Sequence, residues 1–338
     1  MVDFFKKNKD ENNMVRNINI EILRILAMMI IVIYYYHTRE FNTYVISNDR
    51  ISDPDLMPSL LFHSFGKLGV PVFVFISGFY GIKFKMNRMI DILSSSLFYA
   101  LISCIGLYFI YDINAFKSVV FFINNWWFIA AYICLYIMDP AINNFVDSTN
   151  KWTLLFLICI FYYISFGDVS VKSANIGGLY LMFTMYLSSR WISKYCTLFF
   201  RKYCLLLFIS LLILRIVIIY ISYNTTHLGI LPYLNSYVNP LSVLTAAAIF
   251  FVFEKIPTFN KGSKIIMFFS SSALSVYLLS ESGFGQRFFE SLYPIKGNFD
   301  LLHFIYATII VYVVITLIDK GYMFIYSIIK QKINSNEI

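Results

Sequence analysis

Long apolar runs recur along this chain of 338 residues, and they constrain its fold more than any other feature. The hydrocarbon core of a bilayer is about 30 Å thick, and a helix of roughly 20 mostly apolar residues crosses it. Hydrophobic residues make up 59% of the sequence, whereas charged residues make up 14%. A soluble domain cannot bury that much apolar surface. The sequence therefore predicts an all-α fold, a polytopic membrane helix bundle of about ten transmembrane helices.

The apolar runs divide the chain into one membrane domain and two tails. Helices are expected near residues 18–36, 68–82, 92–111, 126–138, 152–165, 176–189, 203–222, 241–254, 265–279 and 301–318. No linker, low-complexity block or repeat separates these segments. We therefore predict an N-terminal tail over residues 1–17, a single transmembrane domain over residues 18–320 and a C-terminal tail over residues 321–338.

Basic residues are distributed unevenly between the connecting segments. Most of the 27 Lys and Arg residues lie in one alternating set of connections, which includes both termini. Cytoplasmic loops carry such an excess, so both termini are predicted to be cytoplasmic, as an even number of helices requires. The net charge of +8 is then a topology signal and a contact with anionic membrane lipids. Nucleic acid is not an expected partner.

The first apolar segment carries charged and titratable residues at both of its ends. Glu21 and Arg24 are three residues apart, so on a helix they share a face and can neutralise each other. His37 lies at the other end, about 20 Å from Arg24 along the helix axis. Ions inside a bilayer face protein or water, which makes this segment a candidate site. The alternative is that Arg24 only anchors the topology by snorkelling to the headgroups.

The other histidines and the cysteines are weaker candidates for chemistry. In the predicted topology His63, His227 and His303 fall on the outer side with His37, and each alone is typical of a solvated or interfacial residue. The five cysteines lie in or beside apolar runs and form no CxxC pair. This pattern indicates small core residues, so we predict no metal site.

Several stretches, taken together and in order, resemble one family of membrane enzymes. They are Asn-Ile-Glu-Ile-Leu-Arg-Ile-Leu-Ala-Met at 19–28, Gly-Val-Pro-Val-Phe-Val-Phe-Ile-Ser-Gly at 69–78 and Trp-Phe-Ile-Ala-Ala-Tyr-Ile-Cys-Leu-Tyr at 127–136, with Pro140 following and looser matches at 177–186 and 274–279. Their order within a chain of ten expected helices resembles the acyltransferase 3 family. That family includes O-acetyltransferases that act on bacterial surface polysaccharides.

The resemblance implies a membrane-bound O-acyltransferase of a bacterial cell membrane, the inner or plasma membrane. Its co-substrate would be cytoplasmic acyl-CoA, and the resemblance implies acetyl-CoA in particular. Its acceptor would be a hydroxyl of a surface or lipid-linked polysaccharide. A histidine of the first helix would be the general base, and imidazole suits that role near neutral pH. Lys83, Lys85 and Arg88 could hold the CoA phosphates, although the positive-inside rule explains them equally well. Arg24 could hold the donor or polarise its carbonyl group.

The spacing within the first helix departs from the family pattern. The family histidine usually follows the Arg after ten intervening residues, about three full turns, so that both side chains share a face. Tyr35 occupies that position here, and a phenol with an ordinary pKa of about 10 is a poor base. His37 is turned about 140° from the Arg24 face, unless a kink or π-bulge intervenes. Later in the chain, Ser280 stands where relatives often have a histidine, and Glu281 follows it.

Two functions remain open on the sequence alone. The first is an O-acyltransferase that uses Glu21, Arg24 and His37, with Tyr35 at the position of the family histidine. The second is a catalytically degenerate relative that transports or senses a glycan or lipid. A channel is disfavoured because no helix carries a repeated polar stripe. Arg215 is a further charge within an apolar run, expected to pair with Glu254 or Asp91 or else to brace the bundle.

Overall fold

The computed structural model describes most of the chain between residues 17 and 336. The described residues are 17–40, 56–120, 122, 126–167, 176–225, 237, 239–258, 262–293 and 301–336. The secondary-structure elements within these ranges are helices, without a strand, which confirms the prediction of an all-α fold.

The helices follow the apolar runs of the sequence. They are α2 (Ile18–Glu40), α3 (Leu56–Gly66), α4 (Gly69–Tyr80), α5 (Met86–Tyr111), α6 (Phe116–Val120), α7 (Trp127–Ser148), α8 (Lys151–Gly167), α9 (Ile176–Tyr195), α10 (Thr197–Asn224), α12 (Pro240–Lys255), α13 (Ser263–Ser270), α14 (Ala273–Ser280), α15 (Gly283–Leu292) and α16 (Leu301–Asn336). Each of the ten expected segments lies on one of these helices or on a consecutive pair. In the described part, seven spans are long and apolar enough to cross a membrane. The other three expected segments correspond to α8, α9 and α12. Helix α8 has 17 residues and α12 has 16, whereas α9 has 20 residues and is not among the seven apolar spans.

Two of the seven spans are interrupted near their middle. The span Leu60–Tyr80 consists of α3 and α4, which meet at a turn of Lys67 and Leu68. Pro71 lies four residues after Lys67 and has no N–H group to bond the Lys67 carbonyl, so the helix kinks there. The span Ser263–Ser280 likewise consists of α13 and α14. The sequence predicted a helix only from residue 68 in the first span, so α3 was missed, and it predicted one unbroken helix over residues 265–279 in the second.

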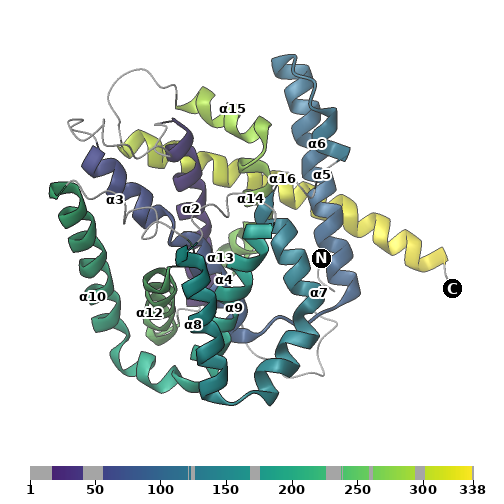
Figure 1. Ribbon diagram of the computed structural model, residues 1–338. Helices are drawn as coiled ribbons and strands as arrows, with labels where there is room; N and C mark the ends of the chain where they lie inside the picture. The colour runs from purple at the N-terminus through teal and green to yellow at the C-terminus, as the bar shows by residue number, and fades with distance from the viewer. Residues whose placement is uncertain are drawn as a thin grey trace.

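Helix α2 lies in the interior of the bundle and organises its neighbours. It packs against α4, α12, α13 and α14, and α4 in turn packs against α9 (Figure 1). The approach of α4 to α2 is close at Gly69, where an added Cβ would lie 2.7 Å from Ile31 Cγ1 and 2.8 Å from the Ala27 carbonyl oxygen. Of the candidate residues of α2, Glu21, Tyr35 and His37 are buried, and Arg24 is partly exposed.

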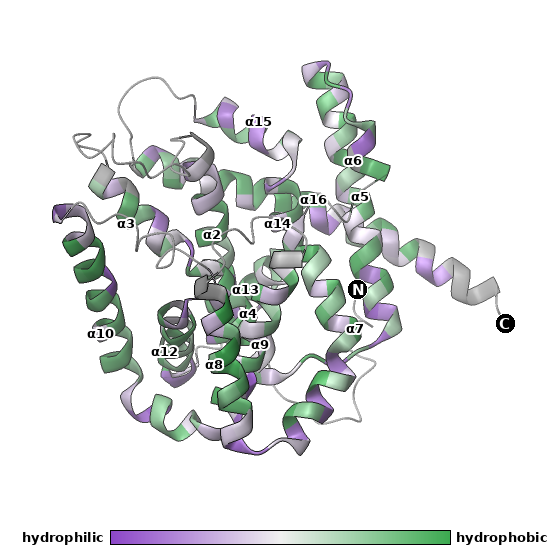
Figure 2. Cartoon of the chain, in the orientation of Figure 1, coloured by the Kyte–Doolittle hydropathy of each residue, from purple (hydrophilic) through white to green (hydrophobic). Residues whose placement is uncertain are grey.

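The periphery of the bundle is apolar, and polar residues gather at its ends. Helix α10 contains the most hydrophobic window of the seven spans, with a mean hydropathy of 2.9, and it lies at one side of the bundle (Figure 2). Figure 2 also shows hydrophilic turns at the edge where α7 ends and α10 begins. Helix α16 continues through residues 321–336, the segment predicted as a tail, and its C-terminal end projects from the bundle (Figure 1). The cytoplasmic location of the termini stays a prediction.

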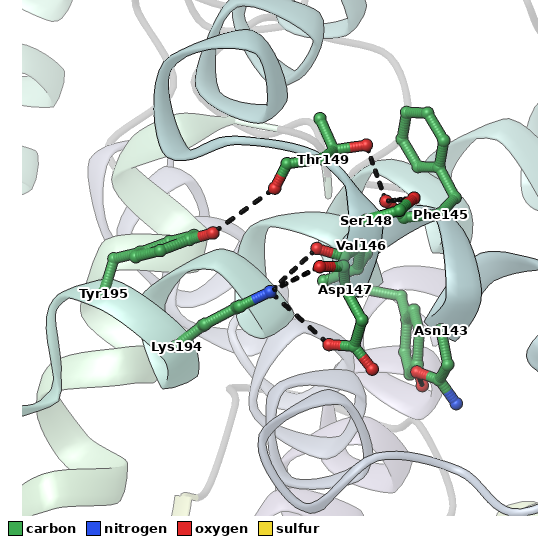
Figure 3. Close-up of polar contacts among 9 residues, drawn as sticks. Asn143, Phe145, Val146, Asp147, Ser148, Thr149, Lys194 and Tyr195 are labelled. Atoms are coloured by element: carbon green, nitrogen blue, oxygen red, sulfur yellow. Dashed lines mark hydrogen bonds and ion pairs between the residues drawn. The ribbon is translucent and has the colours of Figure 1, made fainter.

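The C-terminal end of α7 is fixed to α9 at this polar edge (Figure 3). The ammonium group of Lys194 donates a hydrogen bond to the Val146 carbonyl oxygen at 3.0 Å and lies 3.5 Å from Asp147 Oδ1. The last carbonyl groups of a helix lack partners within the helix, and a nearby Lys satisfies them. The Tyr195 hydroxyl donates to the Thr149 carbonyl oxygen at 3.5 Å. These contacts hold the C-terminal end of α7 in place, where the connection to α8 begins.

Candidate functional site

Glu21 and Arg24 form an ion pair in the first turns of α2, as their spacing predicts. Arg24 Nη1 donates to Glu21 Oε1 at 2.8 Å and to Oε2 at 2.7 Å. The Glu21 side chain is 5% exposed and that of Arg24 is 27% exposed. Glu21 also lies in the first turn of the helix, where the positive end of the helix dipole favours a carboxylate. The pair therefore leaves part of the Arg24 guanidinium accessible while its charge is compensated.

Lys83, Lys85 and Arg88 lie in and after the connection between α4 and α5, and all three are exposed. The connection is ordered by two buried tyrosines. The Tyr186 hydroxyl accepts a hydrogen bond from the backbone N–H of Ile82 at 3.1 Å, and the Tyr136 hydroxyl accepts one from the N–H of Lys85 at 2.8 Å. These bonds hold the basic residues at the polar edge of the bundle, an arrangement that suits both a phosphate site and a topology signal.

The basic connection and the start of α2 lie at the same end of the bundle. Helix α4 packs against α2, and Gly69 at the start of α4 lies beside Ala27 and Ile31 in the middle of α2, so α4 leads from there toward the start of α2. A bound anion at this end of the bundle would be attracted by the guanidinium groups of Arg24 and Arg88.

Tyr35 and His37 diverge at the other end of α2. Tyr35 faces α7, where its hydroxyl accepts a hydrogen bond from Trp127 Nε1 at 2.9 Å. His37 faces α3 and α16 instead, with its ring stacked on Phe62 at 4.0 Å between centroids and edge-on to Phe304 at 6.3 Å. Both side chains are buried. The structure thus has the divergence that 100° per residue requires, and α2 contains no π-bulge that would return His37 to the face of Arg24.

A cluster of aromatic and basic side chains surrounds Tyr35. The Tyr237 ring lies 5.5 Å from that of Trp127, and the Lys67 ammonium lies 5.0 Å from the Tyr237 centroid. The same ammonium is 5.9 Å from the Tyr34 ring, against which His63 packs edge-on at 5.1 Å. Burial, followed by the neighbouring phenols, raises the pKa of Tyr237 well above its ordinary value, so this phenol is neutral. We call Tyr34, Tyr35, His63, Lys67, Trp127 and Tyr237 the aromatic–basic cluster.

Sequence reasoning did not assign Lys67 or Tyr237 to the site. A Lys inside an apolar run, between two glycines and shortly before a proline, was the available signal for Lys67. Tyr237 had no such signal, because its contact with Trp127 joins residues more than a hundred positions apart.

The remaining candidates are dispersed. His303 is exposed at the start of α16 and packs edge-on against Tyr293 at 5.2 Å. Glu281 is half-buried just after α14, and the Ser280 hydroxyl donates to the Tyr277 carbonyl oxygen at 3.3 Å. His227 lies outside the described residues.

Arg215 braces three helices. Its guanidinium is fully buried and donates to the Ser64 carbonyl oxygen at 2.9 Å, to Ser64 Oγ at 2.8 Å and to Ser242 Oγ at 2.7 Å. Of the two acids considered as partners from the sequence, Glu254 pairs with Arg201 at 2.6 Å and Asp91 with Lys330 at 2.9 Å. Arg215 therefore joins α10 to α3 and α12 through neutral oxygen atoms.

Comparison with known proteins gives a match to a protein family. The sequence model of a family described as an acyltransferase domain, that of acyltransferase 3, matches residues 17–320. The match includes all the α2 residues discussed above and the basic connection after α4. Neither a curated protein nor a solved structure matches the chain. The residues that the structure describes contain no group of three His, Cys, Asp or Glu side chains suited to a metal ion.

Proposed function

Because the chain belongs to the acyltransferase 3 family, we propose that it transfers an acyl group, in the simplest case acetyl, from acyl-CoA to a hydroxyl group of a surface or lipid-linked polysaccharide. The chain is a membrane acyltransferase with an all-α bundle. The identities of the donor, the acyl group and the acceptor are our proposal.

The arrangement of α2 carries this proposal. Tyr35 contacts Trp127 of α7, and Arg24 lies within about 20° of Tyr35 around the helix and about 16 Å from it along the axis. A donor whose phosphates bind Lys83, Lys85 and Arg88 at one end would extend its acyl group along this face. Charge-assisted bonds from Lys and Arg are the usual way to bind phosphate. Arg24, held by Glu21, is placed to bind the donor between these two ends.

The chemistry requires one proton acceptor. The acceptor oxygen attacks the thioester carbonyl carbon, the carbon–sulfur bond breaks, and the CoA thiolate leaves. The hydroxyl proton passes to a base. We assign this role to His37, because imidazole titrates near neutral pH, whereas the Tyr35 phenol ordinarily titrates near pH 10. In this assignment the acceptor approaches from the side of α3 and α16, and Tyr35, bonded to Trp127, borders the donor side.

One observation favours a second function. The His37 ring is stacked on Phe62 and lies off the face shared by Arg24 and Tyr35. A chain that lacks a base on the donor face would bind an acylated glycan or lipid without making it, as a transporter or sensor does.

Glycan analysis separates the two functions. Surface and lipid-linked glycans would be compared between cells with and without the gene, by mass spectrometry before and after mild alkali. Loss of one alkali-labile acyl ester in the deletion, restored by the wild-type gene, is the expected result. An unchanged ester content would refute the acyltransferase proposal and favour transport or sensing.

A further inference from the structure

Lys67 occupies an unusual position inside the membrane domain. It lies in the turn that interrupts the span Leu60–Tyr80, next to Gly66. A Cβ added to Gly66 would lie 2.7 Å from the Tyr34 ring, so the turn packs directly against α2. This contact places the half-buried Lys67 at the end of α2 that carries Tyr34 and Tyr35.

The surroundings of Lys67 are basic and aromatic. Its ammonium contacts the rings of Tyr34 and Tyr237, and no described carboxylate forms an ion pair with it. One helical turn earlier lies His63, which is 5% exposed and whose Nδ1 has no hydrogen-bond partner among the described residues. Arg215, which bonds the intervening Ser64, likewise has only neutral oxygen partners in the described part of the chain. Positive charge therefore accumulates at the kink without a compensating acid among the residues that the structure describes.

Such a cation is costly in the membrane unless an anion accompanies it. Contacts with aromatic faces offset only part of this cost. The phosphates of the proposed donor would bind at the opposite end of α2, beside Arg88, about 16 Å from the Tyr35 end. The anion at Lys67 must then come from the other substrate.

We infer that the acceptor glycan carries an anionic group, a sugar carboxylate or a phosphate, and that Lys67 binds this group within the aromatic–basic cluster. The inference rests on the proposed transfer to a glycan and adds the charge class of the acceptor. The rings of Tyr34 and Tyr237 hold the ammonium in place, and Arg215 adds to the positive potential. A neutral acceptor would leave Lys67 uncompensated and would bind more weakly.

Binding of matched sugars tests this inference without depending on transfer. The full-length protein in lipid nanodiscs would be titrated with methyl β-D-glucoside, methyl β-D-glucuronide and α-D-glucose 1-phosphate, followed by tryptophan fluorescence, since Trp127 lies in the cluster. A charge-assisted contact predicts that at least one anionic sugar binds about tenfold or more tightly than the neutral glucoside. Preference for the glucuronide indicates a sugar carboxylate, and preference for the sugar phosphate indicates the phosphate of a lipid-linked glycan.

Two variants assign the preference to Lys67. Lys67→Met keeps an unbranched side chain one atom shorter and removes its charge, so it should abolish the preference, whereas Lys67→Arg should retain it. Equal binding of all three sugars by the wild-type protein would overturn the inference, and so would a preference that survives in Lys67→Met. Loss of acyl transfer in both variants, without any anion preference in the wild type, would make Lys67 a proton acceptor instead. A preference found in a protein that forms no ester would refute the transfer and leave the anion site standing.

Discussion

Replacement of His37 tests the catalytic proposal most directly. His37→Phe removes the imidazole nitrogens and keeps an aromatic ring that can stack on Phe62, which lies 4.0 Å away between ring centroids. A positioned general base contributes at least about a hundredfold to the rate, equivalent to about 2.7 kcal/mol of barrier. The variant should therefore lose at least that factor in acyl transfer and unfold at nearly the wild-type temperature.

The choice of variant separates chemistry from packing. His37→Ala would also lose the aromatic contacts with Phe62 and Phe304, each worth about 0.5–1.5 kcal/mol, so reduced activity there has two explanations. The assay should follow labelled acetyl into the glycan, because thioester hydrolysis in a wet site would release CoA without transfer. Full activity of His37→Phe would refute the assignment of the base. Tyr35→His provides the reverse test, since it places an imidazole within about 20° of the Arg24 direction. If the native site is degenerate, this variant should gain activity where the wild type has none.

Three further predictions concern topology, donor binding and stability. Reporter fusions after Arg88 and Lys264 should be cytoplasmic and a fusion near Lys172 should be external, because basic residues concentrate in cytoplasmic connections; reversal of any neighbouring pair would contradict the topology. Arg88→Gln should weaken CoA binding by roughly tenfold to a hundredfold, measured by calorimetry, while Arg201→Gln at the same polar edge should not; equal effects would indicate general electrostatics. Arg215→Met should lower the free energy of unfolding by about 1–3 kcal/mol for each buried oxygen left unpaired. The control Arg201→Gln, whose side chain is 50% exposed, should lower it by only about 0–1 kcal/mol. An Arg215→Met variant with the thermal stability of the wild type would contradict the bracing role.

Local patterns predicted the helices and the geometry of α2 well. Apolar runs locate helices because long apolar segments are stable in a bilayer, where backbone N–H and C=O groups without hydrogen bonds cost free energy. The three-residue spacing of Glu21 and Arg24 predicts their ion pair, and 100° per residue predicts that Tyr35 and His37 diverge. The kink at Lys67 was missed, although Pro71 was its visible cause, since a proline inside a membrane helix does not by itself determine where the helix breaks.

Contacts between distant segments could not be predicted in the same way. For Arg215 the sequence left open a pair with Glu254, a pair with Asp91 or a bracing role, and only the packing of α10 against α3 and α12 shows its contacts with Ser64 and Ser242. The cluster around Tyr35 likewise depends on Tyr237, which no periodicity links to α2 or α7. The sequence shows which side chains are charged, but only the fold shows which charges have a partner.

This compensation distinguishes the two ends of the bundle. Among the described residues, acids pair with nearby cations at the polar edge, as Glu21 does with Arg24 and Glu254 with Arg201. Around the kink, Lys67 and Arg215 have only aromatic or neutral oxygen partners in the described part of the chain. The net charge of +8 reveals the excess of cations and does not indicate where the unpaired ones lie. Because an unpaired cation costs most where water is excluded, the kink beside α2 is where an anionic substrate would gain the most from binding.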